Sequence, residues 1–255
     1  MTGFSAEWLR LREAADDRAR DAALMIDTVG IAAAPDARIT DLGGGSGATM
    51  RVLGPHLPAA YWRILDHDPA LLALIETGPK ITTEVTDLAA APEAAIAGGP
   101  TLITASAFFD LVSIEWLERF TALLAEAQIP LYAALTYDGR EDWHPRSEFE
   151  EHALMAFHND MRRDKGFGRA LGPGAAGCLQ KMLTSAGFEV KTAPSDWRLE
   201  RHRDSAMMDA LAAGGAEALR SALPAQRHAT WAADRMAAQS VMVGHTDILA
   251  VPKGR

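Results

Sequence analysis

The stretch "RITDLGGGSGATM" (residues 38–50) decides the fold. A short apolar run, interrupted by the acid Asp41, leads directly into four glycines, Gly43, Gly44, Gly45 and Gly47. Glycine tolerates positive φ in a tight turn and lets a ligand approach the main chain, and the first turn of a following helix has unpaired N–H groups. The pattern predicts a strand, a ligand-binding loop and a helix, in that order.

Short apolar runs and helical stretches alternate on both sides of this loop. Alternation at this spacing is typical of a mostly parallel sheet with helices on both faces, as in Rossmann-like α/β proteins. We therefore predict the α/β class. The expected strands are residues 37–42, 61–66, 80–85, 100–106, 129–135, 189–199 and 240–252.

The domain organisation follows from where this alternation begins and ends. We expect one domain over residues 1–255, with an N-terminal helical segment over 1–34. After the fifth strand the sequence becomes polar and rich in His and aromatic residues, and it predicts a helix from about Ser147 to Arg163. Because ligand-facing elements follow the carboxyl ends of parallel strands, residues 137–172 are interpreted as a helical cap inserted over the site.

Composition narrows the class of partner. The net charge is −9, with 34 acidic residues against 25 Lys and Arg, which disfavours nucleic acid and anionic membranes and favours a small molecule. The single Cys178 excludes an internal disulfide and fits a reducing cytoplasm. The spacing of His144, His152 and His158 matches no standard metal pattern, so we expect no metal.

Three acids stand at successive strand ends and discriminate between ligands. The loop alone also satisfies a dinucleotide pattern, and it suits a phosphate. Asp41 disfavours a pyrophosphate and favours a ligand with a positive charge. Asp66 lies 23 residues after Gly43, where a carboxylate binds ribose hydroxyls, although Asp68 is an alternative. Asp87 ends the third strand, where it could accept from an adenine amino group.

The ordered segments "DLGGGSG", "ILDHDPALL", "VTDLA" and "LITASAFFDLVS" resemble the class I S-adenosylmethionine-dependent methyltransferases. The resemblance covers residues 37–136 and the closing "GFEV" and "SVMVGHTDILAVPK" segments. It implies a seven-stranded sheet whose last strand is antiparallel, and S-adenosylmethionine as cofactor. The cofactor-binding residues that it implies are Asp41, Gly43, Gly44, Gly45 and Gly47 for the methionine part, Asp66 and His67 for the ribose, Asp87 and Leu88 for the adenine, and Ser106.

The acceptor side is less defined. Methyl transfer needs a positioned nucleophile and in some enzymes a general base. The candidate catalytic residues are His158, His144 and Asp110. The candidate substrate-binding residues are Tyr137, Asp138, Trp143, Asn159 and Arg162. The basic segment "RRDKGFGR" (162–169) could clamp a carboxylate or phosphate, or it could simply cap a helix.

These observations predict methyl transfer from S-adenosylmethionine to an oxygen or nitrogen of a small molecule. The segment after the fourth strand lacks an Asn-Pro-Pro-Tyr signature, which weakens a nucleic-acid or glutamine substrate. One alternative is a non-catalytic binding or scaffold protein of the same fold. An NAD(P)-dependent oxidoreductase is disfavoured by Asp41 and by the lack of a Tyr-x-x-x-Lys pair. Association into a homodimer is left open.

Overall fold

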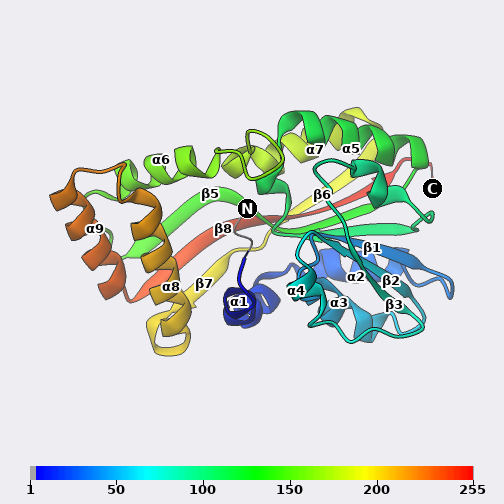
Figure 1. The fold of residues 1–255 in the computed structure, drawn as a ribbon, viewed down its shortest axis with the longest axis horizontal. Helices are drawn as coiled ribbons and strands as arrows, with labels where there is room; N and C mark the ends of the chain where they lie inside the picture. Colours follow the sequence, from blue (N-terminus) through cyan, green and yellow to red (C-terminus); the bar gives the residue numbers. More distant parts are fainter. Residues whose placement is uncertain (1–3, 255) are drawn as a thin grey trace.

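The computed structural model describes residues 4–254, so residues 1–3 and 255 of the predicted segments 1–34 and 1–255 lie outside the described part. The elements form one mixed α/β arrangement (Figure 1). The strands are β1 (Arg38–Leu42), β2 (Tyr61–Asp66), β3 (Ile81–Val85), β4 (Leu102–Ser106), β5 (Leu131–His144), β6 (Phe188–Pro194), β7 (Trp197–Glu200) and β8 (Ser240–Pro252). The α-helices are α1 (Ala6–Ala19), α2 (Ala22–Ile31), α3 (Ala48–Leu53), α4 (Pro69–Leu72), α5 (Ile114–Ala127), α6 (Glu150–Met161), α7 (Ala175–Ser185), α8 (Arg201–Leu219) and α9 (Ala225–Ala237). Short 3-10 helices are η1 (Gly54–His56), η2 (Pro92–Ile96), η3 (Phe109–Leu111) and η4 (Gly172–Gly174).

The sheet has the order β3-β2-β1-β4-β5-β8-β6, and β7 pairs with β8. The first five strands are parallel, whereas β8 is antiparallel to β5, β6 and β7. The chain therefore reverses its strand order between β1 and β4. Ligands of open α/β sheets bind outside the carboxyl ends of the strands at such a point.

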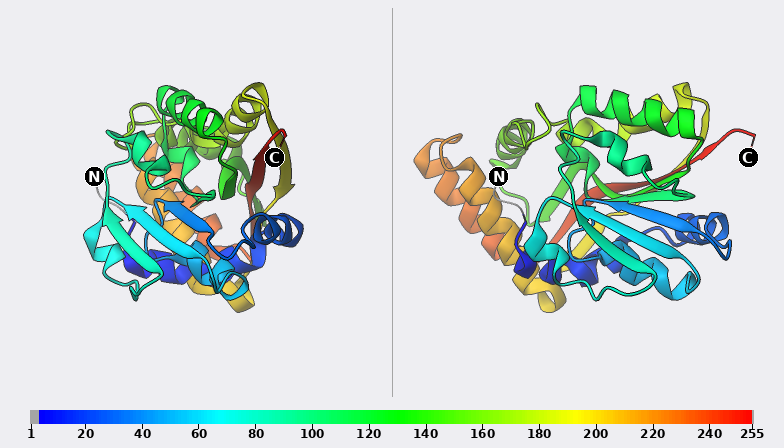
Figure 2. Two further views of the ribbon diagram at one scale, coloured as in Figure 1. Left: turned by 90° about the vertical axis from the view of Figure 1, so that its right-hand side faces the viewer. Right: turned by 45° about the vertical axis from the view of Figure 1, so that its right-hand side comes forward.

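Helices cover both faces of the sheet (Figures 1 and 2). On one face α5 and α7 bury Phe120 and Leu179 against the strands. On the other face α2 and α3 bury Leu24 and Leu53. The near-continuous apolar runs of the central strands are explained by this double coverage, because neither face meets water. The predicted α/β fold class is confirmed.

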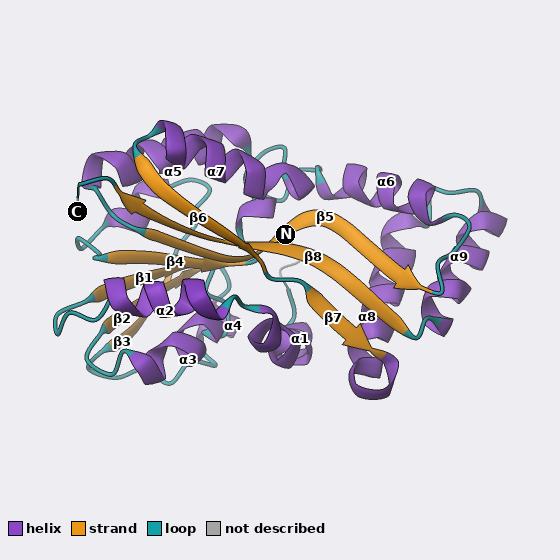
Figure 3. Ribbon diagram, turned by 180° about the vertical axis from the view of Figure 1, so that it is seen from behind, coloured by secondary structure: helices purple, strands orange, loops and turns teal. Residues whose placement is uncertain are grey.

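The fifth strand is longer than predicted. We expected it to end at Leu135, but β5 continues to His144 and pairs with β8 along that extension (Figure 3). Register shifts between Ala133 and Thr136 and between Tyr137 and Glu141 bend the ladder, and Gly139 adopts a φ of +91° within the second. Residues 137–144 are polar and charged, so their sequence does not have the apolar pattern of a strand. They form one because they pair with β8, which is distant in the chain.

The predicted strand over residues 189–199 is two strands. β6 ends at Pro194 and β7 begins at Trp197, and both pair with β8, so the sheet has eight strands instead of seven. Beyond β7, helix α8 packs against β7 and α9, and its Met207 and Met208 join a buried cluster with Trp143 of β5 and Val241 of β8 (Figure 3). Helix α8 ends at Leu219, and Pro224 is the N-cap of α9. No helix within residues 4–254 is both long and apolar enough to cross a membrane.

Candidate active site

The glycine loop lies against buried side chains that leave no room for larger residues. A Cβ atom on Gly43, whose φ is +56°, would lie 2.6 Å from the ring of Phe108. A Cβ on Gly44 would lie 2.5 Å from Ile64 and 2.8 Å from the Asp41 carboxylate. Gly43 and Gly44 therefore cannot carry side chains, because the residues packed beneath and beside the loop leave no room for a Cβ atom.

Asp66 is bound to this loop. Its Oδ2 accepts a hydrogen bond of 2.8 Å from the Gly45 backbone N–H, and its Oδ1 accepts one of 2.9 Å from the Asp68 N–H. The Asp68 carboxylate instead caps α4, accepting from the Ala70 N–H at 2.8 Å. The structure thus gives the two rival acids different positions: Asp66 lies at the loop and Asp68 begins the next helix.

A cavity of about 480 Å³ lies at the carboxyl edge of strands β1 to β4. It combines the glycine loop, the ends of β2 and β4, the turn after β3, and part of α1. All predicted cofactor-binding residues line it except Asp41 and Gly47. Those that line it are Gly43, Gly44, Gly45, Asp66, His67, Asp87, Leu88 and Ser106.

Asp41 lies beneath the loop instead of in the cavity wall. Its side chain is fully buried, its Oδ1 accepts from the Thr104 hydroxyl at 2.7 Å, and its Oδ2 has no hydrogen-bond partner within residues 4–254. Burial raises the pKa of this carboxyl to about 7, although the bond from Thr104 and the charge of Arg20 lower it. A positively charged ligand above the loop would act in the same direction as Arg20 and favour the ionised form of Asp41.

The raised pKa of Asp41 predicts a pH-dependent stability. The folded state holds a proton on Asp41 up to about pH 7, whereas the unfolded carboxyl has a pKa near 3.9. The free energy of unfolding is therefore expected to fall as the pH rises from about 4 to about 7. In Asp41→Asn this fall should be smaller, as urea denaturation at pH 5 and pH 8 would show. An equal fall in the variant would contradict the assignment to Asp41.

Helix α1 forms a wall of the cavity, although no residue of this helix was among the predicted site residues. Leu9, Arg12 and Asp16 line it, and the spacing of these residues places them on one face of the helix. The Arg12 guanidinium donates to both oxygens of Asp16, at 2.9 and 3.1 Å, and lies 4.8 Å from the ring of Trp197. The Trp197 indole N–H also donates to Asp16 at 2.9 Å. The sequence offered one signal for this wall: the apolar Leu9 and the charged Arg12 and Asp16 recur at helical spacing.

Two further segments complete the wall of the cavity. Phe108 and Leu111 follow β4, and Asp164, Lys165 and Phe167 follow α6. Of the basic segment 162–169, Lys165 is the cation that lines the cavity; Arg162, predicted to bind substrate, does not line it. The rings of Phe108 and Phe167 meet edge to face with centroids 5.5 Å apart.

Asp110 stands in the sequence between Phe108 and Leu111, which line the cavity, but does not line it itself. It is nine-tenths buried, and its Oδ1 has no hydrogen-bond partner within the described residues. Burial raises the pKa of its carboxyl to about 6, while the charges of Arg12 and Lys165 lower it. None of the three predicted catalytic residues, His158, His144 and Asp110, lines the cavity.

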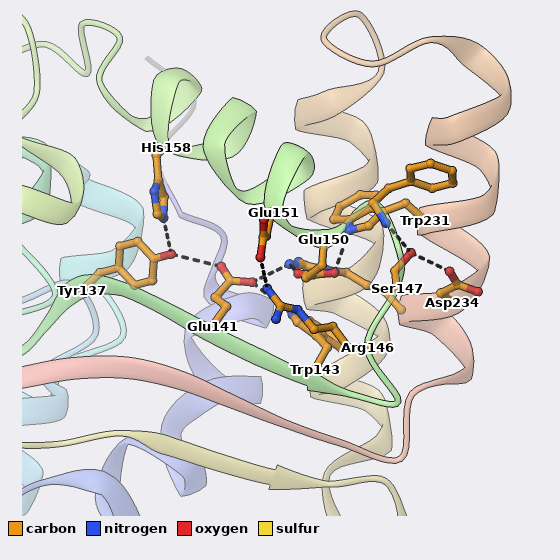
Figure 4. Close-up of polar contacts among 12 residues, drawn as sticks. Tyr137, Glu141, Trp143, Arg146, Ser147, Glu150, Glu151, His158, Trp231 and Asp234 are labelled. Carbon is orange, nitrogen blue, oxygen red and sulfur yellow. Dashed lines mark hydrogen bonds and ion pairs between the residues drawn. The ribbon is translucent and has the colours of Figure 1, made fainter.

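The remaining predicted catalytic and substrate residues do not line the cavity. His158 bonds to the hydroxyl of Tyr137 at 3.0 Å, and that hydroxyl donates to Glu141 at 3.2 Å (Figure 4). The Trp143 indole donates to Glu141 at 3.0 Å. These contacts belong to a buried network on the extension of β5. Asp138 binds Arg140, and His144 and Asn159 are exposed.

Burial lowers the pKa of the His158 imidazole, and Glu141 opposes that shift. The half-buried ring is thus held by Tyr137 within the β5 network.

Within residues 4–254 no cluster of three or more His, Cys, Asp or Glu side chains could hold a metal ion.

No protein-family model matches the sequence, and no curated protein matches it. Solved structures do. A cyclopropane synthase from Mycobacterium tuberculosis has a TM-score of 0.56 at 12% identity, covering 97% of this chain and 94% of that chain. A cyclopropane-fatty-acyl-phospholipid synthase-like protein from Lactobacillus casei has a TM-score of 0.53 at 12% identity, with the same 97% and 94% coverage.

A candidate type II methyltransferase from Anaeromyxobacter dehalogenans has a TM-score of 0.53 at 19% identity, covering 91% of this chain and 96% of that chain. The strand order, the antiparallel β8 and these likenesses define the fold as that of the class I S-adenosylmethionine-dependent methyltransferases. The fold expected from the sequence resemblance is thereby confirmed.

Proposed function

We propose that the protein transfers a methyl group from S-adenosylmethionine to an oxygen or nitrogen atom of a small-molecule acceptor. The observation that carries this proposal is one cavity in which the glycine loop, Asp66 and Asp87 lie together at the carboxyl edge of the parallel strands. Fold alone does not define function, so the argument rests on these side chains.

The residues present fit the cofactor. The bare main chain of Gly43 and Gly44 admits a close ligand, and Asp66 is held in place by two backbone N–H groups. Asp87 accepts from the backbone N–H groups of Ala89 and Ala90 through Oδ1, and no hydrogen bond to its Oδ2 occurs within residues 4–254. We assign Asp66 to the ribose hydroxyls and Asp87 to the adenine amino group.

The unpartnered Oδ2 of buried Asp41 supports a cationic ligand above the loop. S-adenosylmethionine supplies an activated methyl group on a sulfonium and an ammonium group. The chain itself would orient the acceptor and exclude water. Leu9, Phe108 and Phe167 supply apolar surface for that purpose.

Calorimetric titration of the purified protein with S-adenosylmethionine and S-adenosylhomocysteine tests this function. We expect both to bind, and we expect Asp66→Ala to weaken binding by about tenfold to a hundredfold, which corresponds to about 1.4–2.7 kcal/mol. The physical reason is that charge-assisted hydrogen bonds to two hydroxyls are lost.

Asp68→Ala is the matched control, because Asp68 caps α4 and does not line the cavity. It should bind both compounds nearly as well as the wild type. Absence of binding to the wild type would contradict the enzyme function and favour a scaffold role. Binding of a nicotinamide cofactor, followed by fluorescence, would favour an oxidoreductase.

A further inference from the structure

A second cleft, of about 310 Å³, lies where α1 packs on β7 and α8 (Figure 3). Among the described residues it shares none with the lining of the cavity beside the glycine loop. Three of its seven lining residues are arginines, one from each of these elements: Arg18, Arg198 and Arg203. The cleft therefore presents positive charge on a chain whose net charge is −9.

Direct contacts hold these three arginines together. The Asp204 carboxylate joins two of them, because its Oδ1 accepts from Arg18 at 2.7 Å and its Oδ2 accepts from Arg203 at 2.8 Å. Arg203 also donates to the backbone carbonyl of Arg198 at 2.8 Å. The Arg198 guanidinium in turn donates to Asp196, which lines the same cleft, at 3.2 Å. The three guanidinium groups thus belong to one connected set of contacts.

The carboxylates of this set are less exposed than the guanidinium groups. The Asp196 and Asp204 side chains are 5% and 9% exposed. Those of Arg18, Arg203 and Arg198 are 41%, 45% and 76% exposed. A ligand that enters from solvent therefore meets mainly guanidinium groups.

The guanidinium groups also outnumber the carboxylates that they bind. Four of them share three carboxylates: Arg18, Arg140, Arg198 and Arg203 bind Asp138, Asp196 and Asp204. Within residues 4–254 no hydrogen bond uses Nε or Nη1 of Arg18 and Arg198, or Nη1 of Arg203. These N–H groups remain available to an anion.

We propose that this cleft binds the phosphate group of a small phosphorylated molecule, and that the bound phosphate holds α1 to β7 and α8. A phosphate has more oxygen atoms than a carboxylate, so arginines from three elements can donate to it together. Ala15, Ala19 and Pro194 also line the cleft and supply apolar surface for the organic part of the molecule. The volume is sufficient for a small organic ligand.

Helix α1 connects this cleft with the cavity. Its Arg12 and Asp16 line the cavity, whereas its Arg18 lines the cleft. Asp16 also accepts from the indole N–H of Trp197 in β7 at 2.9 Å. A phosphate bound by Arg18 and by the arginines of β7 and α8 adds a contact across the same junction. The ligand would therefore stabilise the position of a helix that forms a wall of the cavity.

Calorimetric titration of the full chain at constant ionic strength tests the site with three probes: phenyl phosphate, inorganic phosphate and phenol. We expect phenyl phosphate to bind at least about tenfold more tightly than either of the other two, because only this probe has both the charge and the apolar part. Arg198→Met should weaken its binding by at least about tenfold, since charge-assisted hydrogen bonds are lost. Asp196 keeps Arg140 as its partner in this variant, so no carboxylate is left without a counter-charge.

Two control variants separate this cleft from other causes of binding. Arg220→Met removes an exposed guanidinium that pairs with one carboxylate, Glu217, outside the cleft. Lys165→Met removes a cation that lines the cavity instead. Both should bind phenyl phosphate as the wild type does. Weaker binding in Lys165→Met, or unchanged binding in Arg198→Met, would place the ligand elsewhere and overturn the site.

Hydrogen exchange of the α1 backbone amides, over Ala6–Ala19, tests the effect on the helix. If opening of α1 disrupts the site, phenyl phosphate at ten times its Kd should slow this exchange by about tenfold. At the same concentration Arg198→Met should show much less slowing. Unchanged α1 exchange in the wild type would overturn the role in holding α1, and equal affinity for inorganic and phenyl phosphate would overturn the organic ligand. None of these measurements needs S-adenosylmethionine, so their failure is distinguishable from failure of the proposed function.

Discussion

Replacement of Arg235 by methionine is expected to lower the free energy of unfolding by about 3–5 kcal/mol. The Arg235 guanidinium is buried and donates to Glu141 at 2.7 Å and to Glu150. Its carbon Cζ lies 4.5 Å from the ring centroids of both Trp143 and Trp231. Removing the one cation leaves two buried carboxylates without a counter-charge. Urea denaturation at neutral pH measures the effect.

A triple variant separates charge from packing. Arg235→Met combined with Glu141→Gln and Glu150→Gln removes the uncompensated charges and should recover most of the loss, because a neutral buried set is often as stable as the ionic one. Arg220→Met is the exposed control: Arg220 pairs with Glu217 on the surface and should change stability by less than about 0.5 kcal/mol. An effect of Arg235→Met no larger than that of the control would contradict the network's role in holding α9 to β5.

The parts of the site that the sequence predicted share one property. The glycine loop, Asp66 and Asp87 each belong to a short contiguous motif at the end of a strand, and parallel strands bring those ends to one edge of the sheet. The local sequence pattern was therefore enough to predict that these residues lie together in the fold. Asp41 was found by the same pattern, but the pattern did not show that its side chain points beneath the loop, where Gly44 leaves it room.

The parts that were missed depend on pairings between distant segments. Trp143, Tyr137 and His158 were predicted to meet substrate, yet they bind Glu141 and one another because β5 extends along β8. A buried polar network and a substrate site use the same residue types, so composition cannot separate them. Arg12 reaches the cavity because α1 packs on β7, nearly two hundred residues later.

Replacement of Gly44 by alanine is expected to lower the free energy of unfolding by about 1–3 kcal/mol, the usual cost of overpacking a buried site. The added Cβ would lie 2.5 Å from Ile64 and 2.8 Å from the Asp41 carboxylate, both fully buried. Neither neighbour can move into open space, so the loop must shift. We expect that shift to weaken S-adenosylhomocysteine binding by about a hundredfold, equivalent to about 2.7 kcal/mol.

The same substitution at Gly177 provides the matched control. Gly177 lies inside α7, and a Cβ there would meet nothing within 4 Å. Alanine at this position should raise the free energy of unfolding by about 0.5–1 kcal/mol, because glycine costs about that much in a helix. Thermal or urea unfolding of both variants, with calorimetric binding beside it, compares them directly. If Gly44→Ala kept wild-type binding and stability, the bare main chain would not be what the cavity requires, and the assignment of the loop to the cofactor would fail.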